Sequence, residues 1–149
     1  MWNARRSLLL SKICVLVFMA ALAAALIAGP WLVSWLIGFS ANAHQQHTPW
    51  FLATLYSGGV FAGILLVQLY RLLHNIGQGG VFTAKNISLL RGISWCCFAG
   101  AFICLFSAIY YLPWGAVAVA AAFIGLIVRV VKNVLAQALA LKEENDYTI

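Results

Sequence analysis

The nine lysine and arginine side chains all lie on one side of a pattern of four apolar segments, and no other feature constrains the fold as strongly. They form three groups along the chain: Arg5, Arg6 and Lys12, then Arg71, Lys85 and Arg91, then Arg129, Lys132 and Lys142. Loops rich in lysine and arginine are retained in the cytoplasm when a membrane protein inserts. The distribution therefore predicts an integral membrane protein whose two termini and middle loop are all cytoplasmic.

The four apolar segments are each long enough to cross a bilayer. They cover about residues 8–36, 50–73, 93–112 and 116–136, and one crossing requires about 20 residues. The chain is 64% hydrophobic and only 8% charged, whereas roughly a quarter of the residues are charged in a soluble domain. We therefore predict a single all-α domain over residues 1–149, folded as an integral membrane four-helix bundle with N-in/C-in topology.

Polar or helix-breaking residues separate or interrupt these spans. Residues 74–92 are predicted as a cytoplasmic loop, in which glycines end the second span and Thr83 caps the next helix. Residues 137–149 are predicted as a cytoplasmic tail into which the last helix continues. Pro30 predicts a kink or break in the long first segment, because proline disrupts a helix interior.

The spans contain too few reactive groups to assemble a catalytic or metal centre. All three acidic residues lie in the last seven positions, so the membrane interior has no carboxylate for proton-coupled export. The histidines stand at different depths, with His44 and His47 in the outer loop and His74 at the inner edge, so they cannot share one haem iron. The four cysteines form no Cys-x-x-Cys pair. We therefore expect no enzymatic activity, no metal and no cofactor.

Polar and small residues inside the spans are the remaining candidates there. Gly59 and Gly63 form a GxxxG pair, which is typical of a helix-packing face. Gln68 and Arg129 are polar residues within apolar segments. Arg129, with Lys132 one turn further on, can extend its side chain toward the lipid headgroups, and contact with a buried partner or ligand is the alternative.

The positive net charge of the chain indicates contact with lipid. The net charge is +6, but the basic residues are spread singly beside apolar spans and form no patch of the kind that binds nucleic acid. We therefore predict contact with the bilayer and no direct contact with nucleic acid. Small-residue helix faces often self-associate, so a homodimer is a further candidate.

Two peptide motifs carry a family resemblance. One is Gly80-Val-Phe-Thr-Ala-Lys-Asn86 followed by Leu90-Arg91, and the other is the ending Lys142-Glu-Glu-Asn-Asp-Tyr-Thr-Ile149. Together they resemble a bacterial family of small four-span membrane proteins, the domain of unknown function DUF2975. The resemblance extends from the second span to the C-terminus, whereas the first span and outer loop match only in hydrophobic outline. Lys85 replaces an expected acidic residue, and Tyr147 a commonly aliphatic one.

The resemblance implies a protein of the bacterial inner membrane without an assigned activity, whose relatives are often encoded beside a small helix-turn-helix DNA-binding protein. We interpret the chain as a membrane-bound interaction or regulatory module that tethers such a regulator through loop 74–92 and the tail. The candidate partner-binding residues are Phe82, Thr83, Lys85, Asn86, Arg91, Glu143, Glu144, Asn145 and Asp146.

Two sets of alternatives stay open at this point. The acidic tail is either a solvated helix end, or docks on the basic loop, or is offered to a basic partner. The second class of function is transport or immunity, in which Gln68, Arg129 and the aromatic outer rim recognise a small molecule or a membrane-active peptide.

Overall fold

A computed structural model describes residues 3–40 and 47–147 of the chain. The described residues form five helices, namely α1 (Ala4–Ile27), α2 (Gly29–Phe39), α3 (Thr48–Gly77), α4 (Ala84–Ser107) and α5 (Pro113–Tyr147). Four of them, α1, α3, α4 and α5, are long and apolar enough to cross a membrane. The predicted all-α fold with four candidate membrane spans is thus confirmed.

The first apolar segment is broken at Pro30. Helix α1 ends at Ile27, and α2 begins at Gly29 with the proline in its first turn. Proline lacks an amide proton, and its ring would clash with the carbonyl four residues earlier if the helix continued. That carbonyl belongs to Leu26, and it accepts a hydrogen bond from the Tyr56 hydroxyl of α3 at 3.1 Å. The first span is therefore shorter than the predicted segment 8–36, and the rest of that segment folds as a separate short helix.

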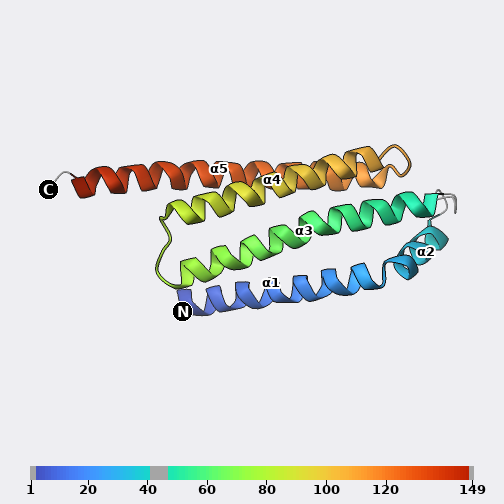
Figure 1. Cartoon of the computed structure of the whole chain (residues 1–149), viewed down its shortest axis with the longest axis horizontal. Helices are drawn as coiled ribbons and strands as arrows, with labels where there is room; N and C mark the ends of the chain where they lie inside the picture. The colour runs from blue at the N-terminus through green and yellow to red at the C-terminus, as the bar shows by residue number, and fades with distance from the viewer. Residues whose placement is uncertain (1–2, 41–46, 148–149) are drawn as a thin grey trace.

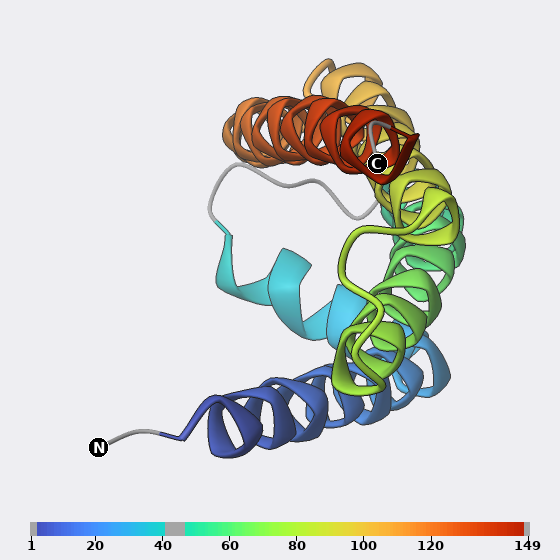
Figure 2. The same cartoon turned by 90° about the vertical axis from the view of Figure 1, so that its left-hand side faces the viewer.

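The long helices form an open, curved row. Helix α1 packs along α3, α3 along α4, and α4 along α5, while α2 packs against α3. Figure 2 shows this row as an arc with α1 and α5 at its two ends. The described helices thus form an open arc, an arrangement that the predicted four-helix bundle did not specify. Lipid covers apolar helix faces as well as another helix does, so burial alone does not force the row to close.

Two clusters of buried side chains hold the row together. One lies between the end of α3 and the first half of α4 and is formed by Leu72, Leu90, Ile93 and Cys97. The other lies at the opposite end, where Val33, Ile37 and Phe51 pack beside the α4–α5 hairpin. Helices α3 and α4 contribute most of this core, so they provide the rigid centre of the fold.

A hydroxyl cluster joins α3 to α4 at the end of the molecule opposite the chain termini. The Thr54 and Ser107 hydroxyls are 2.6 Å apart. The Tyr110 hydroxyl donates to the Trp50 carbonyl at 3.1 Å. Thr54 and Ser107 also bond carbonyls of their own helices, at Trp50 and Ile103, so these hydroxyls both satisfy the backbone and link two helices.

The charged segments meet at one end of the fold. Figure 1 shows that the start of α1, the connection from α3 to α4 and the end of α5 all lie at the same end. Helix α5 continues through most of the predicted tail, as far as Tyr147. This arrangement places the three groups of basic residues toward the same end of the helices, which makes that end the candidate site.

Candidate functional site

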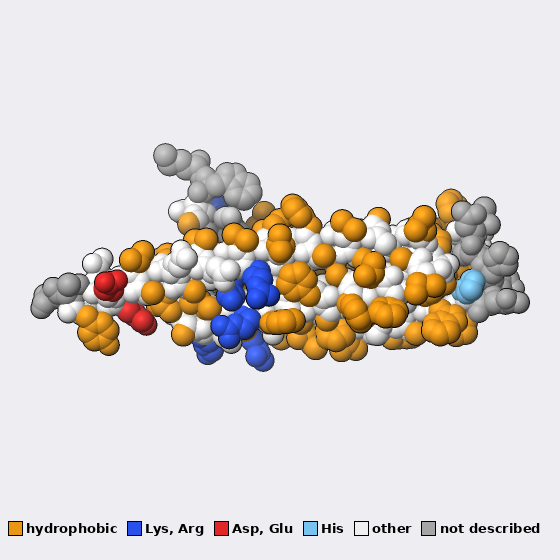
Figure 3. All heavy atoms as spheres, turned by 90° about the horizontal axis from the view of Figure 1, so that it is seen from above, with side chains coloured by type: hydrophobic (Ala, Val, Ile, Leu, Met, Phe, Trp, Pro, Cys, Tyr) orange, Lys and Arg blue, Asp and Glu red, His pale blue; other side chains and the backbone are white. Residues whose placement is uncertain are grey.

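Charged side chains separate the apolar surface from the end of α5. Figure 3 shows lysine and arginine side chains gathered into a compact group, with most of the exposed apolar surface on one side and the acidic side chains on the other. Such a sequence of apolar, basic and acidic zones is expected where a protein leaves the hydrocarbon and enters the headgroup region. The candidate site therefore includes the α3–α4 loop, the basic group and the acidic helix end.

The loop between α3 and α4 has a defined conformation. Gly79 has a φ of +88°, which glycine adopts without steric conflict. The Gly80 amide donates to the Asn75 carbonyl at 3.3 Å. Thr83 caps α4, because its Oγ1 accepts a hydrogen bond from the Asn86 amide at 3.3 Å. The predicted glycine turn and the predicted Thr83 cap are both confirmed.

Asn86 is the residue that holds this loop in place. Its side chain is 1% exposed. Its Nδ2 donates to the carbonyl oxygens of Gly80 and Val81, the latter at 3.0 Å. Its Oδ1 accepts from Asn75 Nδ2 of α3 at 3.1 Å. The Asn86 amide is therefore occupied inside the loop, and a direct contact of Asn86 with a partner stays a prediction.

The neighbours of Asn86 divide into capping and exposed residues. Thr83 is half-buried and is used for the cap described above. Phe82 is 43% exposed, and Lys85 and Arg91 are exposed as well. The loop thus presents one aromatic and two cationic side chains on a backbone that Asn86 holds rigid.

The acidic tail is an exposed helix end. Glu143, Glu144, Asn145 and Asp146 are all exposed on the last turns of α5. Figure 1 shows the end of α5 extending past α4 and past the α3–α4 connection. In this arrangement the tail is not folded back over the loop, so it is oriented toward the space beyond the membrane-spanning part.

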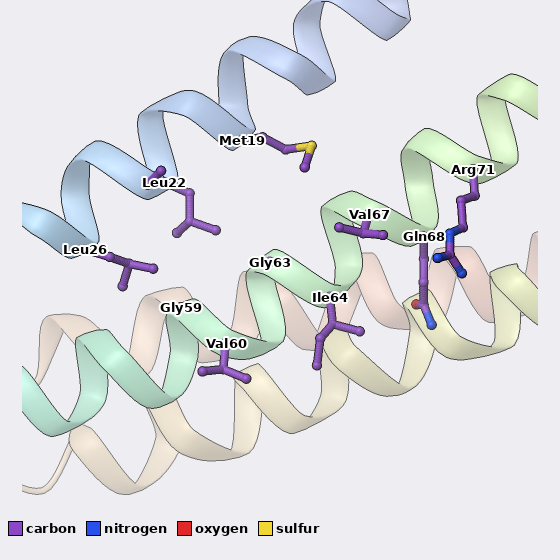
Figure 4. Close-up of a pocket in the computed structure, with 11 residues that line it drawn as sticks. Met19, Leu22, Leu26, Gly59, Val60, Gly63, Ile64, Val67, Gln68 and Arg71 are labelled. Atoms are coloured by element: carbon purple, nitrogen blue, oxygen red, sulfur yellow. The ribbon is translucent and has the colours of Figure 1, made fainter.

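The two intramembrane polar residues lie in different places. Gln68 lies at one end of a groove of about 570 Å³ between α1 and α3 (Figure 4). Its Oε1 atom is buried without a hydrogen-bond partner among the described residues, and its amide packs against Gly92 of α4. Arg129 instead lines a pocket between α4 and α5, together with Arg91 and Lys132. The structure therefore does not join Gln68 and Arg129 in one ligand site.

The glycine pair on α3 faces α1 along this groove. A Cβ at Gly59 would lie 2.6 Å from Leu26 Cδ2, and one at Gly63 would lie 3.8 Å from Leu22 Cδ2. Figure 4 shows Leu22 and Leu26 directed from α1 toward these glycines. The pair therefore accommodates leucine side chains of α1, and Gly59 has less space than Gly63.

The histidines and cysteines form no metal site in the described part of the chain, where no three metal-ligating side chains gather. The His47 ring stacks on Tyr110, with ring centroids 6.0 Å apart. The side chain of His44 lies outside the described residues. All four cysteines are free thiols.

A family model described as "Protein of unknown function (DUF2975)" matches residues 7–149, which is nearly the whole chain. The chain belongs to the DUF2975 family. The match includes the first span and the outer loop, which resembled the family only in hydrophobic outline when the motifs were compared. No curated protein and no solved structure shows a significant match to the chain.

The geometry gives a physical reason for one of the two motifs of this DUF2975 protein. In the run from Gly80 to Asn86, Gly80 supplies a carbonyl, Thr83 the helix cap and Asn86 the amide that joins them. The motif therefore encodes a fixed turn between two membrane helices. Phe82 and Lys85 are the two large side chains within it that are exposed and take no part in these hydrogen bonds.

Three residues at this end were missed by sequence reasoning. Asn75 was not singled out, although it donates a hydrogen bond to Asn86. Ser94 and Trp95 of α4 were not connected with the basic residues, although they line the same pocket as Arg91. For Ser94 and Trp95 the signal was present in the spacing, since they follow Arg91 by three and four residues, and residues so spaced on a helix share a face.

Proposed function

We propose that this DUF2975 protein is a non-enzymatic, multi-pass protein of the bacterial inner membrane that acts as an interaction or regulatory module. Its termini and α3–α4 loop face the cytoplasm, and the exposed end of α5 together with the loop is the docking surface. The observation that carries the proposal is the helical continuation of α5 to Tyr147, which presents every acidic residue of the chain beyond the basic group.

The charge of this helix end supports a basic partner. The C-terminus of a helix carries a partial negative charge from its unpaired carbonyls, and acidic side chains there are unfavourable. The last turn of α5 contains no basic residue, while Glu143, Glu144 and Asp146 lie within its last five positions. A cationic partner surface would offset this repulsion, so the tail is better suited to binding than to stabilising its own helix.

The partner we propose is a small cytoplasmic helix-turn-helix protein, the class that the family resemblance implies. Proteins of this class carry basic surfaces that contact phosphate groups of DNA. An acidic helix end that occupies such a surface would compete with DNA. Tethering the partner at the membrane would therefore also lower its binding to DNA. The exposed Phe82 of the loop adds an aromatic contact beside the charged one.

Removal of residues 143–149 is expected to reduce capture of this partner to background while the protein still inserts. The measurement is co-purification of the neighbouring helix-turn-helix protein from detergent-solubilised membranes, at low and high salt. The triple variant Glu143→Gln, Glu144→Gln, Asp146→Asn should lose capture equally, because it removes the charges and keeps the helix. Lys142→Gln is the matched control and should retain capture. Undiminished capture by the truncated protein would overturn the proposal.

The groove between α1 and α3 favours a second candidate, recognition of an amphipathic small molecule or membrane-active peptide in transport or immunity. Its walls are apolar side chains of both helices, and Gln68 and Arg71 provide polar groups at one end (Figure 4). Pockets with apolar walls and few polar groups are the usual form of ligand sites. Arg129, the other residue first considered for this role, belongs to a different pocket.

Filling this groove tests the second candidate. Gly63→Leu is expected to abolish tolerance or flux, because the added side chain would project into the groove beside Leu22. Gly58→Leu is the matched control, since a Cβ at Gly58 has no atom within 4 Å. The readouts are survival of cells exposed to the membrane-active peptide and uptake of a labelled amphipathic compound. Normal tolerance and flux in the Gly63→Leu strain would exclude this candidate.

A further inference from the structure

Three cations from two helices converge on one pocket between the first turns of α4 and the middle of α5. The pocket has a volume of about 180 Å³ and is lined by Arg91, Ser94, Trp95, Arg129 and Lys132. We propose that it binds a phosphate group, and that the phosphate is the headgroup of an anionic phospholipid. This site is separate from the tail and from the α1–α3 groove, so it goes beyond the function proposed above.

The packing of α4 on α5 fixes the position of these cations. Ser94 Oγ donates to the Gly125 carbonyl at 3.0 Å, which aligns the two antiparallel helices at this level. Arg91 lies three residues from Ser94, and Arg129 lies four residues from Gly125, both toward the charged end. With a rise of about 1.5 Å per residue, the two arginines stand about 4.5 and 6 Å from the aligned level. They are therefore at nearly the same depth on adjacent helices.

No acidic side chain lines the pocket to balance this charge. The acidic residues of the chain begin at Glu143, which is roughly 16 Å further along α5 than Lys132 at the normal helical rise. Like charges held close together repel more strongly where water is partly excluded. An anion with several oxygen atoms removes the repulsion, and arginine side chains bind phosphate oxygens with paired hydrogen bonds.

The location of the pocket indicates that the phosphate comes from a lipid. The basic side chains mark the boundary of the apolar surface in Figure 3, which is the depth at which headgroup phosphates lie. Trp95, which lines the same pocket, is 61% exposed, and tryptophan favours this interface because its ring is apolar and its N–H is polar. A lipid thus has contacts for both its phosphate and the adjoining glycerol region, whereas a soluble phosphate would use only the cations.

The test compares lipid binding by the full-length protein in detergent, with retained lipids counted by native mass spectrometry. Phosphatidylglycerol, phosphatidylcholine and inorganic phosphate are titrated separately. The double variant Arg129→Gln, Lys132→Gln should weaken phosphatidylglycerol binding about 25-fold, since each cation near an anionic lipid contributes roughly a fivefold factor. The double variant Arg5→Gln, Arg6→Gln removes the same number of charges outside the pocket, from two exposed side chains, and should change binding little. Lys132→Gln alone is the milder variant if the double variant does not fold.

The outcomes separate the lipid from a soluble anion. The proposal is supported if the wild-type protein prefers phosphatidylglycerol to phosphatidylcholine and the pocket variant loses this preference. Retention of phosphatidylcholine should be the same in both proteins. Displacement of phosphatidylglycerol by inorganic phosphate at similar concentration would assign the site to a soluble phosphate and overturn its assignment to a lipid. Equal losses in the pocket and Arg5/Arg6 variants, or no preference for phosphatidylglycerol, would show that the cations act only as a diffuse positive surface.

Discussion

Replacement of Asn86 with alanine is expected to lower the free energy of unfolding by about 2–4 kcal/mol, measured by titration with sodium dodecyl sulfate and far-ultraviolet circular dichroism. The side chain is 1% exposed and makes hydrogen bonds to two loop carbonyls and to Asn75. Truncation to alanine removes all of these bonds together. The cost is large because the loop carbonyls and the Asn75 amide then lose the partners that the buried amide provided.

Two further variants show which part of the Asn86 amide matters. Asn86→Asp keeps an oxygen that can accept from Asn75, but it replaces the donor to Gly80 and Val81 with an acceptor, so it should destabilise at least as much as alanine. Lys85→Ala changes the adjacent exposed side chain, and surface substitutions of that kind alter stability by about 0.5 kcal/mol or less. Equal stability of the Asn86→Ala and Lys85→Ala proteins would be incompatible with the structural role of this asparagine.

The sequence was sufficient to predict the spans because the bilayer imposes a simple length requirement. Four apolar segments and one-sided basic residues identify four membrane helices without any knowledge of how they pack. The break at Pro30 was also predictable, since no helix interior accommodates proline without losing a hydrogen bond. The use of the freed Leu26 carbonyl by Tyr56 was not, because that contact joins positions 30 residues apart.

The arrangement of the helices and the roles of single side chains required the structure. Hydrophobic periodicity orients soluble helices, but in a membrane every face is apolar, so the sequence does not distinguish an open arc from a closed bundle. Because the helix faces are uniformly apolar, no sequence pattern indicated the hydrogen bond from Ser94 of α4 to the Gly125 carbonyl of α5. Asn86 was grouped with the partner-binding candidates because it belongs to the motif on the loop, and its burial and its bonds to the loop backbone became visible only in the structure.

Gly125→Leu is expected to destabilise the protein by about 2–3 kcal/mol, the usual cost of overpacking a close helix contact. A Cβ at this position would lie 2.9 Å from the Cβ of Cys97 and 3.4 Å from the Phe98 ring. A Cβ cannot move without its backbone, so α4 and α5 must separate to admit the new side chain. That separation would also lengthen the hydrogen bond from Ser94 to the Gly125 carbonyl. Detergent titration of the variant measures the loss.

Gly100→Leu is the matched control, because a Cβ at Gly100 has no neighbouring atom within 4 Å. It should unfold close to the wild-type midpoint, since leucine favours the helix and meets no obstacle. The Gly125 variant has a second consequence that stability alone does not show. Moving α5 away from α4 separates Arg129 from Arg91, so lipid retention should fall even in the fraction that stays folded. A wild-type midpoint together with normal lipid retention in Gly125→Leu would mean that α4 and α5 do not approach closely at this glycine.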